Sequence, residues 1–469
     1  MLLTVHARAT RTGESLLQTI APSTESKISV THAVEEAVEY FHQVCTALEA
    51  FATTFAKTDR FVFHLASMRR MYLDLFEIGE KLDKVVENGG LKSMEDRMWL
   101  KQLQLDREKE ETELSTRAGR NALPFARNML PHEPMEALTL LKFEIDYFKP
   151  GNSVKHVASM KKVFFSVVRS SNGRVAKIPE WYIPPYAVNY SRVKGIEGSV
   201  GTCFRGVWVN RKPLEGKPEK DEGEEKPKTY DVVVKRILIH ADAIEFFRQE
   251  VETWFAMNHP NVLKIHGASH CSRRALIMYE DATNNALVMY LKSKTFASRA
   301  IWKLFLQAAQ GLKFLHDNKI VHGNLKSDNI LVTADETVKL TDFGLGMFAL
   351  QNQAVQDKKF YELGWRAPNC FQNKKFLRRP GFQDDIYSLG LCILDVLVPS
   401  LSSIVPDNRP NSPKHVGDVG FNPLSSSVMA LIGDESVKKL IIDMCQENPE
   451  KRLTLTCVIS RMEKLCNTQ

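Results

Sequence analysis

An ordered set of short motifs between residues 195 and 344 constrains the fold of this chain more than any other feature. The set begins with a glycine-rich segment, continues with a lysine after a β-branched run and a glutamate in a helical pattern, and ends with polar motifs. His322, Asn329 and Asp342 lie in these last motifs, at separations of seven and thirteen residues. Each motif occurs alone by chance, but a joint accident across the ordered set is improbable. We therefore interpret the motifs together.

The glycine-rich segment reads Gly-Ile-Glu-Gly-Ser-Val-Gly over residues 195–201. Missing side chains let backbone N–H groups approach phosphate oxygens, and Gly198 and Gly201 fit the second and third glycines of a GxGxxG pattern. Ile196 stands where the first glycine belongs, with Gly195 displaced by one position. Alone, the segment fits a glycine-containing hairpin equally well. The motifs that follow favour a phosphate-binding interpretation.

A lysine and a glutamate follow the glycine-rich segment. The run 232–234 of three valines predicts a strand that delivers the Lys235 ammonium group towards phosphates. Residues 246–251 predict a helix that offers Glu250 as the ion-pair partner of Lys235. A single glutamate of this kind is more often a surface charge, and only its place in the ordered set favours the functional interpretation.

Together these residues resemble a protein kinase domain over about residues 188–467, most similar in style to the tyrosine-kinase-like group of Ser/Thr kinases. The resemblance implies an α+β, bilobal kinase fold that binds ATP and Mg²⁺. It implies that Lys235 and Glu250 form an ion pair at the phosphates, that Lys326 faces the γ-phosphate, and that Asn329 and Asp342 contact the metal.

The same alignment assigns three further positions. Glu280 begins the hinge that meets adenine, and Tyr279 is the gatekeeper before it. Asp385 belongs to a DxxSxG segment that anchors the catalytic loop from below.

The departures from the kinase pattern lie on the side that handles the phosphoryl acceptor. Asn324 replaces the catalytic aspartate, and a neutral amide has no proton-accepting state near pH 7. Losing such a base costs about 10²–10⁴ in rate. Asp328 is a weak candidate for a replacement base, because its neighbour Asn329 implies that it points elsewhere. Gly323 replaces the arginine that often pairs with an activation-loop phosphate, and residues 343–366 contain no Ser or Thr.

Two further losses concern structure around the site. Residues 363–365 lack the threonine that Ser/Thr kinases place beside the catalytic aspartate. Asn369 replaces the glutamate that usually pairs with a buried arginine, here Arg452. Because an uncompensated buried charge is costly, we expect a substitute carboxylate or hydrogen bond near Arg452.

Three functions fit this pattern. The first is a pseudokinase that binds ATP and Mg²⁺ and acts through protein contacts, with the Lys235–Glu250 pair as the latch of a two-state element. The second is an active, low-turnover Ser/Thr protein kinase in which Asn324 only positions the hydroxyl. The third is a scaffold that binds no nucleotide, because Ile196 crowds the phosphates.

The chain of 469 residues is long enough for a further domain before the kinase-like one. Apolar spacing of three and four predicts a helical bundle over residues 29–150, with helices over 30–57, in the next segment with its pattern from Leu65 up to Asn88, after Ser93, and over 135–148. We expect a disordered tail over 1–28, a connector over 151–187 with strand-like clusters from about Val154, and a flexible insert over 210–229. The bundle is a candidate surface for protein partners.

Composition excludes several function classes. The net charge of +7 is not concentrated in a basic block, which argues against nucleic acid as a partner. No apolar stretch approaches the ~18 residues of a membrane span. The eight cysteines form no CxxC pair and favour reduced core positions in a cytoplasmic protein.

Overall fold

The computed structural model describes most of the chain, and the statements below concern these residues: 1–20, 32–56, 60–91, 98–119, 133–147, 151–171, 178–190, 195–198, 201–210, 228–239, 243–270, 274–344, 365–372, 375–376, 379–398 and 422–467. It divides into two compact units. The first, the helical unit, comprises Met1–Lys194 with Gly206–Tyr230, and the second, the kinase unit, comprises Gly195–Arg205 with Asp231–Gln469.

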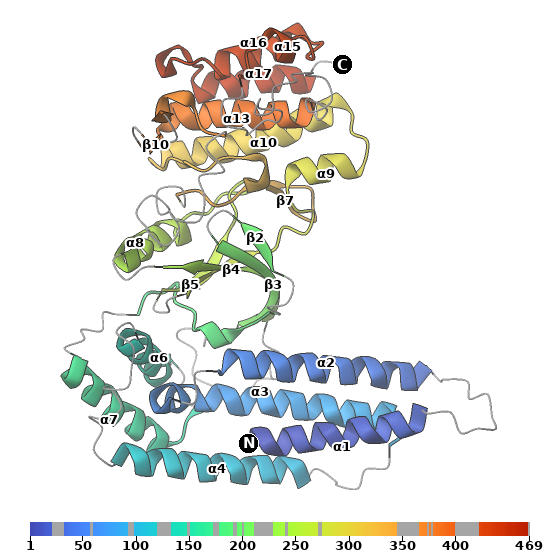
Figure 1. Cartoon of the computed structure of the whole chain (residues 1–469), viewed down its shortest axis with the longest axis vertical. Helices are drawn as coiled ribbons and strands as arrows, with labels where there is room; N and C mark the ends of the chain where they lie inside the picture. Colours follow the sequence, from blue (N-terminus) through green and yellow to red (C-terminus); the bar gives the residue numbers. More distant parts are fainter. Residues whose placement is uncertain are drawn as a thin grey trace, which may run out of the picture. The chain divides into compact units, whose positions relative to one another are not determined.

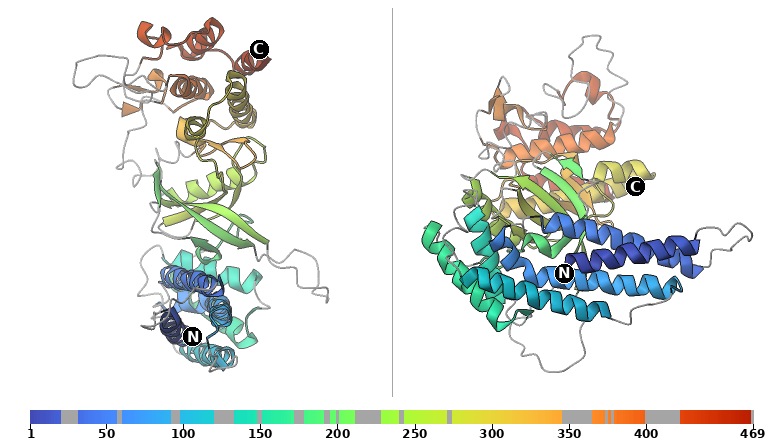
Figure 2. Two further views of the ribbon diagram at one scale, coloured as in Figure 1. Left: turned by 90° about the vertical axis from the view of Figure 1, so that its right-hand side faces the viewer. Right: turned by 60° about the horizontal axis from the view of Figure 1, so that its bottom comes forward.

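Six long helices build the helical unit, and α3 contacts each of the other five (Figures 1 and 2). Its core is apolar and rich in leucine: Leu65, Leu75 and Leu82 of α3 are fully buried, together with leucines of α4 and α6. The helices are α1 (Leu2–Ile20), α2 (His32–Thr54), α3 (Phe61–Asn88), α4 (Met98–Gly119), α6 (Glu133–Tyr147) and α7 (Val154–Ser171).

Helix α3 ends at Asn88, directly before Gly89 and Gly90, as the sequence predicts. The Gly89 N–H donates to the Val85 carbonyl at 2.9 Å, and the Leu91 N–H donates to the Val86 carbonyl at 3.0 Å. Gly90 has φ +59°, in the left-handed region that glycine adopts without a Cβ penalty. The bundle helices predicted from apolar spacing are therefore present.

Two predictions about this unit are wrong. Residues 2–20 form helix α1 instead of a disordered tail, because Val5, Ala9 and Leu16 lie on one helical face and are buried. The segment after Val154 is helix α7 instead of strand-like clusters, since its buried residues Met160, Val163 and Val167 repeat at helical spacing.

The connector between helices and sheet is anchored in the helical unit. Trp181 and Tyr182 are fully buried, and the 3-10 turn η2 (Pro185–Ala187) presents Tyr186. The Tyr186 hydroxyl donates to the Glu144 carboxylate at 2.6 Å, and Glu144 accepts two bonds from Arg69 at 2.8 and 3.0 Å. The predicted insert over 210–229 lies almost entirely outside the described residues.

The kinase unit joins a sheet to a helical part, which confirms the α+β kinase fold preceded by a helical bundle (Figure 1). The sheet has the order β1-β3-β4-β6-β5, with β2 paired to β3, and helix α8 contacts β5. The strands of the sheet, with α8, are β1 (Val188–Tyr190), β2 (Ile196–Gly198), β3 (Gly201–Asn210), β4 (Lys228–Leu238), α8 (Ile244–Phe255), β5 (Ile265–Ser269) and β6 (Arg274–Glu280). By the division given above, β1, the second half of β3 and the first residues of β4 count with the helical unit.

The helical part is built around the apolar helix α13, which contacts α9, α10 and α16. A short hairpin, β7 paired antiparallel with β8, carries the segment between the two polar motifs of the sequence. The elements are α9 (Leu287–Ser293), α10 (Ser298–Asp317), η4 (Ser327–Asn329), β7 (Ile330–Val332), β8 (Val338–Leu340), η5 (Pro368–Cys370), β9 (Phe371–Gln372), β10 (Lys375–Phe376), α13 (Phe382–Leu397), α15 (Ser426–Met429), α16 (Glu435–Met444), η6 (Pro449–Lys451) and α17 (Leu455–Asn467).

The cysteines follow the prediction only in part. Cys370, Cys392, Cys445 and Cys466 are buried free thiols, whereas Cys45 and Cys457 are exposed. In the part of the chain that the structure describes, no helix combines the length and the apolar character needed to cross a membrane.

His270, which follows β5, predicts a pH dependence of the kinase unit. Burial, and then the charge of Arg248, lower its pKa to about 4. Because the unfolded chain binds a proton near pH 6.5 and the folded unit does not, stability is full above pH 6.5 and falls towards pH 4. We expect this histidine alone to lower the free energy of unfolding by about 2 kcal/mol between pH 7 and pH 5. Urea unfolding of wild type and His270→Gln at both pH values measures the difference, with the exposed His42→Gln as control; equal pH slopes for wild type and His270→Gln would contradict it.

Candidate nucleotide and acceptor site

The glycine-rich segment forms the turn-proximal ends of two paired strands. Gly198 at the end of β2 lies directly opposite Gly201 at the start of β3, and residues 199–200 between them lie outside the described part. A Cβ on Gly201 would come within 2.2 Å of the Arg236 carbonyl oxygen on β4, so this position requires glycine. Ile196 pairs with Cys203 and has an exposed side chain. The paired strands agree with a glycine-containing hairpin, and phosphate binding by this segment stays a prediction.

Lys235 is delivered by the central strand β4, as the run of valines predicts. Its Cα pairs with Ile277 of β6, and the residue is 2% exposed. Its ammonium group forms an ion pair with the Asp342 carboxylate, which is also buried. The two groups expected to hold the phosphates and the metal therefore bind each other in this structure.

Glu250 does not pair with Lys235, contrary to the expected ion pair. Among the described residues it has no charged partner, and burial raises the pKa of its carboxyl group. Glu250 still lies beside residues 342–344, called the metal loop below because the resemblance assigns Asp342 to the metal. A Cβ on Gly344 would approach Oε2 of Glu250 to 2.9 Å and Nε1 of Trp254 to 2.8 Å. Helix α8 is therefore in place next to the site, with its glutamate unpaired.

The metal loop is fixed by aromatic packing and backbone bonds. Phe343 makes edge contacts with Trp254 of α8 and with His322, at centroid distances of 6.2 and 6.4 Å. The Gly344 N–H donates to the His322 carbonyl at 3.0 Å. Asp342 has φ +61°, a conformation that is uncommon outside glycine and that occurs mostly with Asn and Asp. These contacts hold the Asp342 carboxylate towards Lys235.

Asn329 is oriented so that its amide oxygen remains for a ligand. The side-chain Nδ2 of Asn329 donates to the Asn324 backbone carbonyl at 2.7 Å. The backbone carbonyl of Asn329 accepts from the Thr341 N–H at 3.0 Å. An amide oxygen and the Asp342 carboxylate are the hard oxygen ligands that suit Mg²⁺. The residues present therefore fit a magnesium nucleotide, with Asp342 now bound to Lys235.

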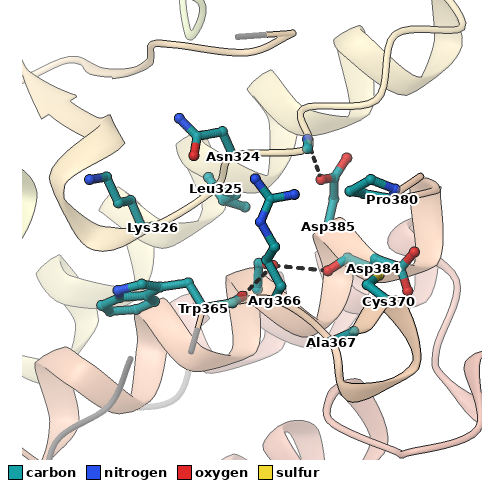
Figure 3. A pocket seen from close by; sticks show the side chains of 12 residues that line it. Asn324, Leu325, Lys326, Trp365, Arg366, Ala367, Cys370, Pro380, Asp384 and Asp385 are labelled. Atoms are coloured by element: carbon teal, nitrogen blue, oxygen red, sulfur yellow. Dashed lines mark hydrogen bonds between the residues drawn. The ribbon is translucent and has the colours of Figure 1, made fainter. Parts of the chain in front are cut away.

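The segment 322–329, which the resemblance assigns as the catalytic loop, is anchored by Asp385 at the start of α13 (Figure 3). Its carboxylate accepts from the backbone N–H groups of His322 and Gly323, both at 2.8 Å, and lies 2.9 Å from Nε2 of His316. The anchoring role predicted for Asp385 is therefore confirmed. Gly323 has φ +65°, which its missing side chain permits.

The loop brings Asn324 and Lys326 into the same buried region. Both residues are less than a tenth exposed, and the Asn324 Nδ2 is buried with no hydrogen-bond acceptor. The Asp328 side chain is 72% exposed, and its carboxylate lies 3.7 Å from Nζ of Lys326. The structure thus supports the expectation that Asp328 points away from the position of the lost base.

The predicted gatekeeper Tyr279 and hinge residue Glu280 are the last two residues of β6. The Glu280 N–H donates to the Lys264 carbonyl at 3.1 Å, and its carboxylate accepts from the Lys264 N–H at 2.7 Å and from Lys339 at 2.8 Å. The Glu280 side chain is therefore engaged within the protein. Tyr279 is buried, and this burial, followed by the charge of Asp342, raises its pKa.

Asp384 is the substitute partner of Arg452, and the sequence interpretation did not identify it. Nη1 of Arg452 donates to Asp384 at 2.9 Å, and Nη2 donates to the Asn369 amide oxygen at 2.7 Å. The Asn369 Nδ2 donates in turn to Asp384 at 3.0 Å, which closes a triangle. The only signal in the sequence is a second aspartate immediately before Asp385.

Comparison with known proteins adds the family. The family described as protein tyrosine and serine/threonine kinase matches residues 195–462. The chain is 30% identical over 242 residues to the cytoplasmic tyrosine-protein kinase BMX of Mus musculus, covering 50% of this chain and 35% of that protein. It is 25% identical over 278 residues to an Aurora kinase of Schizosaccharomyces pombe, covering 57% and 75%.

A putative leucine-rich repeat receptor-like serine/threonine-protein kinase of Arabidopsis thaliana is 26% identical over 304 residues, covering 60% of this chain and 32% of that protein. The chain thus spans about a third of the length of the mouse and plant proteins. These relatives include both tyrosine and serine/threonine kinases.

Proposed function

Because the chain belongs to the protein tyrosine and serine/threonine kinase family, we propose that it is a pseudokinase that binds ATP with Mg²⁺ and acts through protein contacts. The observation that carries the proposal is the contrast between two halves of one site. Lys235, Asn329 and Asp342 converge with the chemistry that a magnesium nucleotide needs, whereas Asn324 occupies the position of the base. The motif style further suggests the tyrosine-kinase-like group.

Nucleotide binding requires a rearrangement of the Lys235–Asp342 ion pair. ATP supplies phosphate oxygens for the lysine, and Mg²⁺ supplies a counter-charge for the aspartate. Glu250 of α8, which lies beside Gly344, then offers Lys235 an alternative carboxylate. Burial raises the pKa of the Glu250 carboxyl group, so its ionised form gains from a cationic partner. The two states of this element are thus one with Lys235 paired to Asp342 and one with Lys235 paired to Glu250. Nucleotide would shift the population towards the second state.

Phosphoryl transfer lacks a base in this arrangement. The Asn324 amide cannot accept a proton, and the exposed Asp328 carboxylate is held towards Lys326 at the surface. An active low-turnover kinase remains a second candidate, favoured by the packing of Phe343 between Trp254 and His322, which keeps the metal loop next to the catalytic loop. We propose that the helical unit supplies a protein-contact surface, since Leu3 and Leu17 of α1 are 83% and 68% exposed.

Melting the full chain with and without millimolar Mg-ATP tests the proposal. Ligand at 10 times its Kd stabilises by about 1.4 kcal/mol, which raises Tm by roughly 2–4 °C in a domain of this size. We expect this rise for wild type and its loss with Asp342→Asn, each measured against the variant's own melting temperature without nucleotide. The exposed Asp328→Asn is the matched control. No rise for wild type would favour the scaffold that binds no nucleotide.

A transfer assay with radiolabelled ATP separates the pseudokinase from the low-turnover kinase. We expect no incorporation by wild type into itself or a general protein substrate. The variant Asn324→Asp restores an aspartate at the position of the base. The assay measures whether this variant incorporates more phosphate than wild type. Incorporation by wild type that disappears with Asp342→Asn would overturn the pseudokinase assignment.

A further inference from the structure

Two helices of the helical unit carry exposed charges of a single sign. Helix α2 contains four glutamates and no lysine or arginine, whereas α7 contains three lysines, one arginine and no acidic residue. Each of the other four helices carries both signs, and on α4 and α6 opposite charges pair along the helix. The exposed charges are Glu35, Glu36, Glu39 and Glu49 on α2, and Lys155, Lys161, Lys162 and Arg169 on α7. Helices α2 and α7 therefore lack charges of the opposite sign on their own length.

Three of the glutamates, Glu35, Glu39 and Glu49, form an acidic stripe along α2. Their spacings of four and ten residues place them on one side of a helix with about 3.6 residues per turn. Among the residues that the structure describes, none of the three carboxylates has a cationic partner, and Glu39 accepts only from the neutral Gln43 amide at 3.5 Å. Like charges four residues apart destabilise a helix. A cation placed against this side of α2 would therefore be stabilising.

Helix α7 presents a basic stripe, in which cations lie between apolar side chains. Its members are exposed and repeat at spacings of three and four residues: Val154, Ala158, Lys161, Phe165 and Arg169. Val154 is 88% and Phe165 is 59% exposed. Among the described residues Lys161 has no anionic partner, and Arg169 donates only to the backbone carbonyl of Phe165 at 3.2 Å. The apolar face of α7 is already buried in the core of the unit, so the helix cannot insert that face into a bilayer. The basic stripe therefore fits an acidic protein surface better than a lipid interior.

The acidic and the basic stripe match in length and lie apart in one chain. The charges run from residue 35 to 49 on α2 and from 155 to 169 on α7, fourteen positions each, which is about 21 Å at about 1.5 Å per residue. Helix α2 packs on α3 and α1, whereas α7 packs on α6, α4 and α3, and Figures 1 and 2 show the two helices on different sides of the unit. The partner of each stripe must therefore come from another molecule.

We propose that α2 of one chain docks against α7 of a second copy of this chain. A second copy supplies the stripe of opposite sign and equal length, and Val38, which is 43% exposed on α2, adds apolar contact to Phe165 and Val154. The inference rests on the protein contacts that the proposed function assigns to the helical unit, names their partner, and requires no nucleotide. Because exposed ion pairs contribute little individually and are screened by salt, the contact depends on several pairs and weakens as salt rises.

Sedimentation velocity of the full chain in the absence of nucleotide tests this proposal. We expect the weight-average sedimentation coefficient to rise with protein concentration at about 0.05 M salt, and the dissociation constant to be at least about tenfold higher at about 0.5 M salt, where screening is stronger. A chain that sediments as a monomer at every concentration in low salt, or that associates equally in both salts, would overturn the proposal. Because no nucleotide is present, a missing thermal shift with Mg-ATP is a separate result that concerns only nucleotide binding.

Charge reversal assigns the contact to the two stripes. Lys161→Glu with Arg169→Glu makes the basic stripe acidic, and Glu39→Lys with Glu49→Lys makes the acidic stripe basic. We expect each double variant alone to self-associate at least about tenfold more weakly than wild type, because like charges then meet. An equimolar mixture of the two variants should associate as tightly as wild type, since every stripe again meets one of opposite sign. A mixture that stays monomeric would contradict the pairing of α2 with α7.

Lys101→Glu with Lys109→Glu on α4 is the matched control, because it changes the net charge by the same amount at exposed positions of the same unit. We expect this variant to self-associate like wild type, and an equal loss would assign the association to net charge alone and overturn the proposal. Vesicles of phosphatidylglycerol test a lipid surface as the occupant of the basic stripe. A chain that stays monomeric and binds these vesicles through Lys161 and Arg169 would likewise overturn the proposal.

Discussion

Replacing Asp384 with alanine should lower the free energy of unfolding of the kinase unit by about 3–5 kcal/mol. The substitution leaves the buried Arg452 guanidinium without its carboxylate, and the Arg452 and Asp384 side chains are 0% and 4% exposed in the pair. Removing one partner of a buried pair leaves an uncompensated charge, which costs more than the pair contributes. Urea unfolding measures the change.

Asn369→Glu is the matched rescue for this variant. A glutamate at 369 restores a carboxylate at the point where Nη2 of Arg452 already donates, so the double variant should regain most of the lost stability. The Gly381 N–H, which bonds to Asp384, stays without its acceptor, and a lost cap of this kind retains a cost of about 0.5–2 kcal/mol. The exposed pair Lys313–Asp317 is the control: Asp317→Ala should cost no more than about 1 kcal/mol. A cost for Asp384→Ala as small as that of the control would contradict the role of Asp384.

The Arg452 network shows which part of the site can be predicted from the sequence. The loss of the usual glutamate is visible at Asn369, and the need for a replacement follows from the cost of a buried charge. The replacement itself is not visible, because Asp384 is 68 positions from Arg452 and only the fold brings them together. The same holds for His316, which reaches the Asp385 carboxylate across 69 positions.

The pairing of Lys235 is a second limit of the same kind. The order of motifs predicts that Lys235, Glu250 and Asp342 lie at one site, and the structure places them there. The resemblance predicts Glu250 as the partner of Lys235, which is wrong for this structure, because the order of motifs brings the groups to one site without fixing which carboxylate contacts the lysine. The sequence identifies the lysine and the two carboxylates of the site. The conformations of residues 342–344 and of α8 decide which carboxylate pairs with the lysine.

In the helical unit, apolar periodicity predicts helix α3 correctly, whereas composition leads to wrong predictions for α1 and α7. Helix α3 has long apolar residues at regular spacing and a glycine end, so its existence and its end follow from the sequence. Helix α1 is rich in Thr, and its buried face includes Gly13, where a Cβ would approach the Phe41 ring to 2.5 Å. A face made of small residues gives a weak apolar signal although it packs closely. In α7 the β-branched composition suggests strands, yet the buried residues repeat at helical spacing.

Replacing Glu144 with glutamine should destabilise the helical unit by about 3–5 kcal/mol. Glu144 is fully buried and accepts two bonds from Arg69 of α3 and one from the Tyr186 hydroxyl. The amide is isosteric, so the cost comes from the uncompensated Arg69 charge and not from a cavity. The pKa of Arg69 is raised by its bond and its attraction to Glu144, which act against the larger effect of burial, and this supports a charged guanidinium in the folded unit. Urea unfolding followed by circular dichroism measures the loss of these helices.

A triple variant separates the charge from the packing at this position. Arg69→Met, Glu144→Leu and Tyr186→Phe together remove the three polar side chains with the shortest bonds in the network, and leave only the part-buried Asn152, whose Nδ2 donates to Glu144 at 3.4 Å. Such apolar replacements of buried ion networks are often neutral or stabilising. We therefore expect the triple variant to be more stable than Glu144→Gln alone. On the same helix, Lys142 and Asp146 form an exposed pair, and Asp146→Asn should cost no more than about 0.5 kcal/mol. If Glu144→Gln costs as little as Asp146→Asn, the network does not hold the connector in the helical unit, and the anchoring of Tyr186 must come from the burial of its ring.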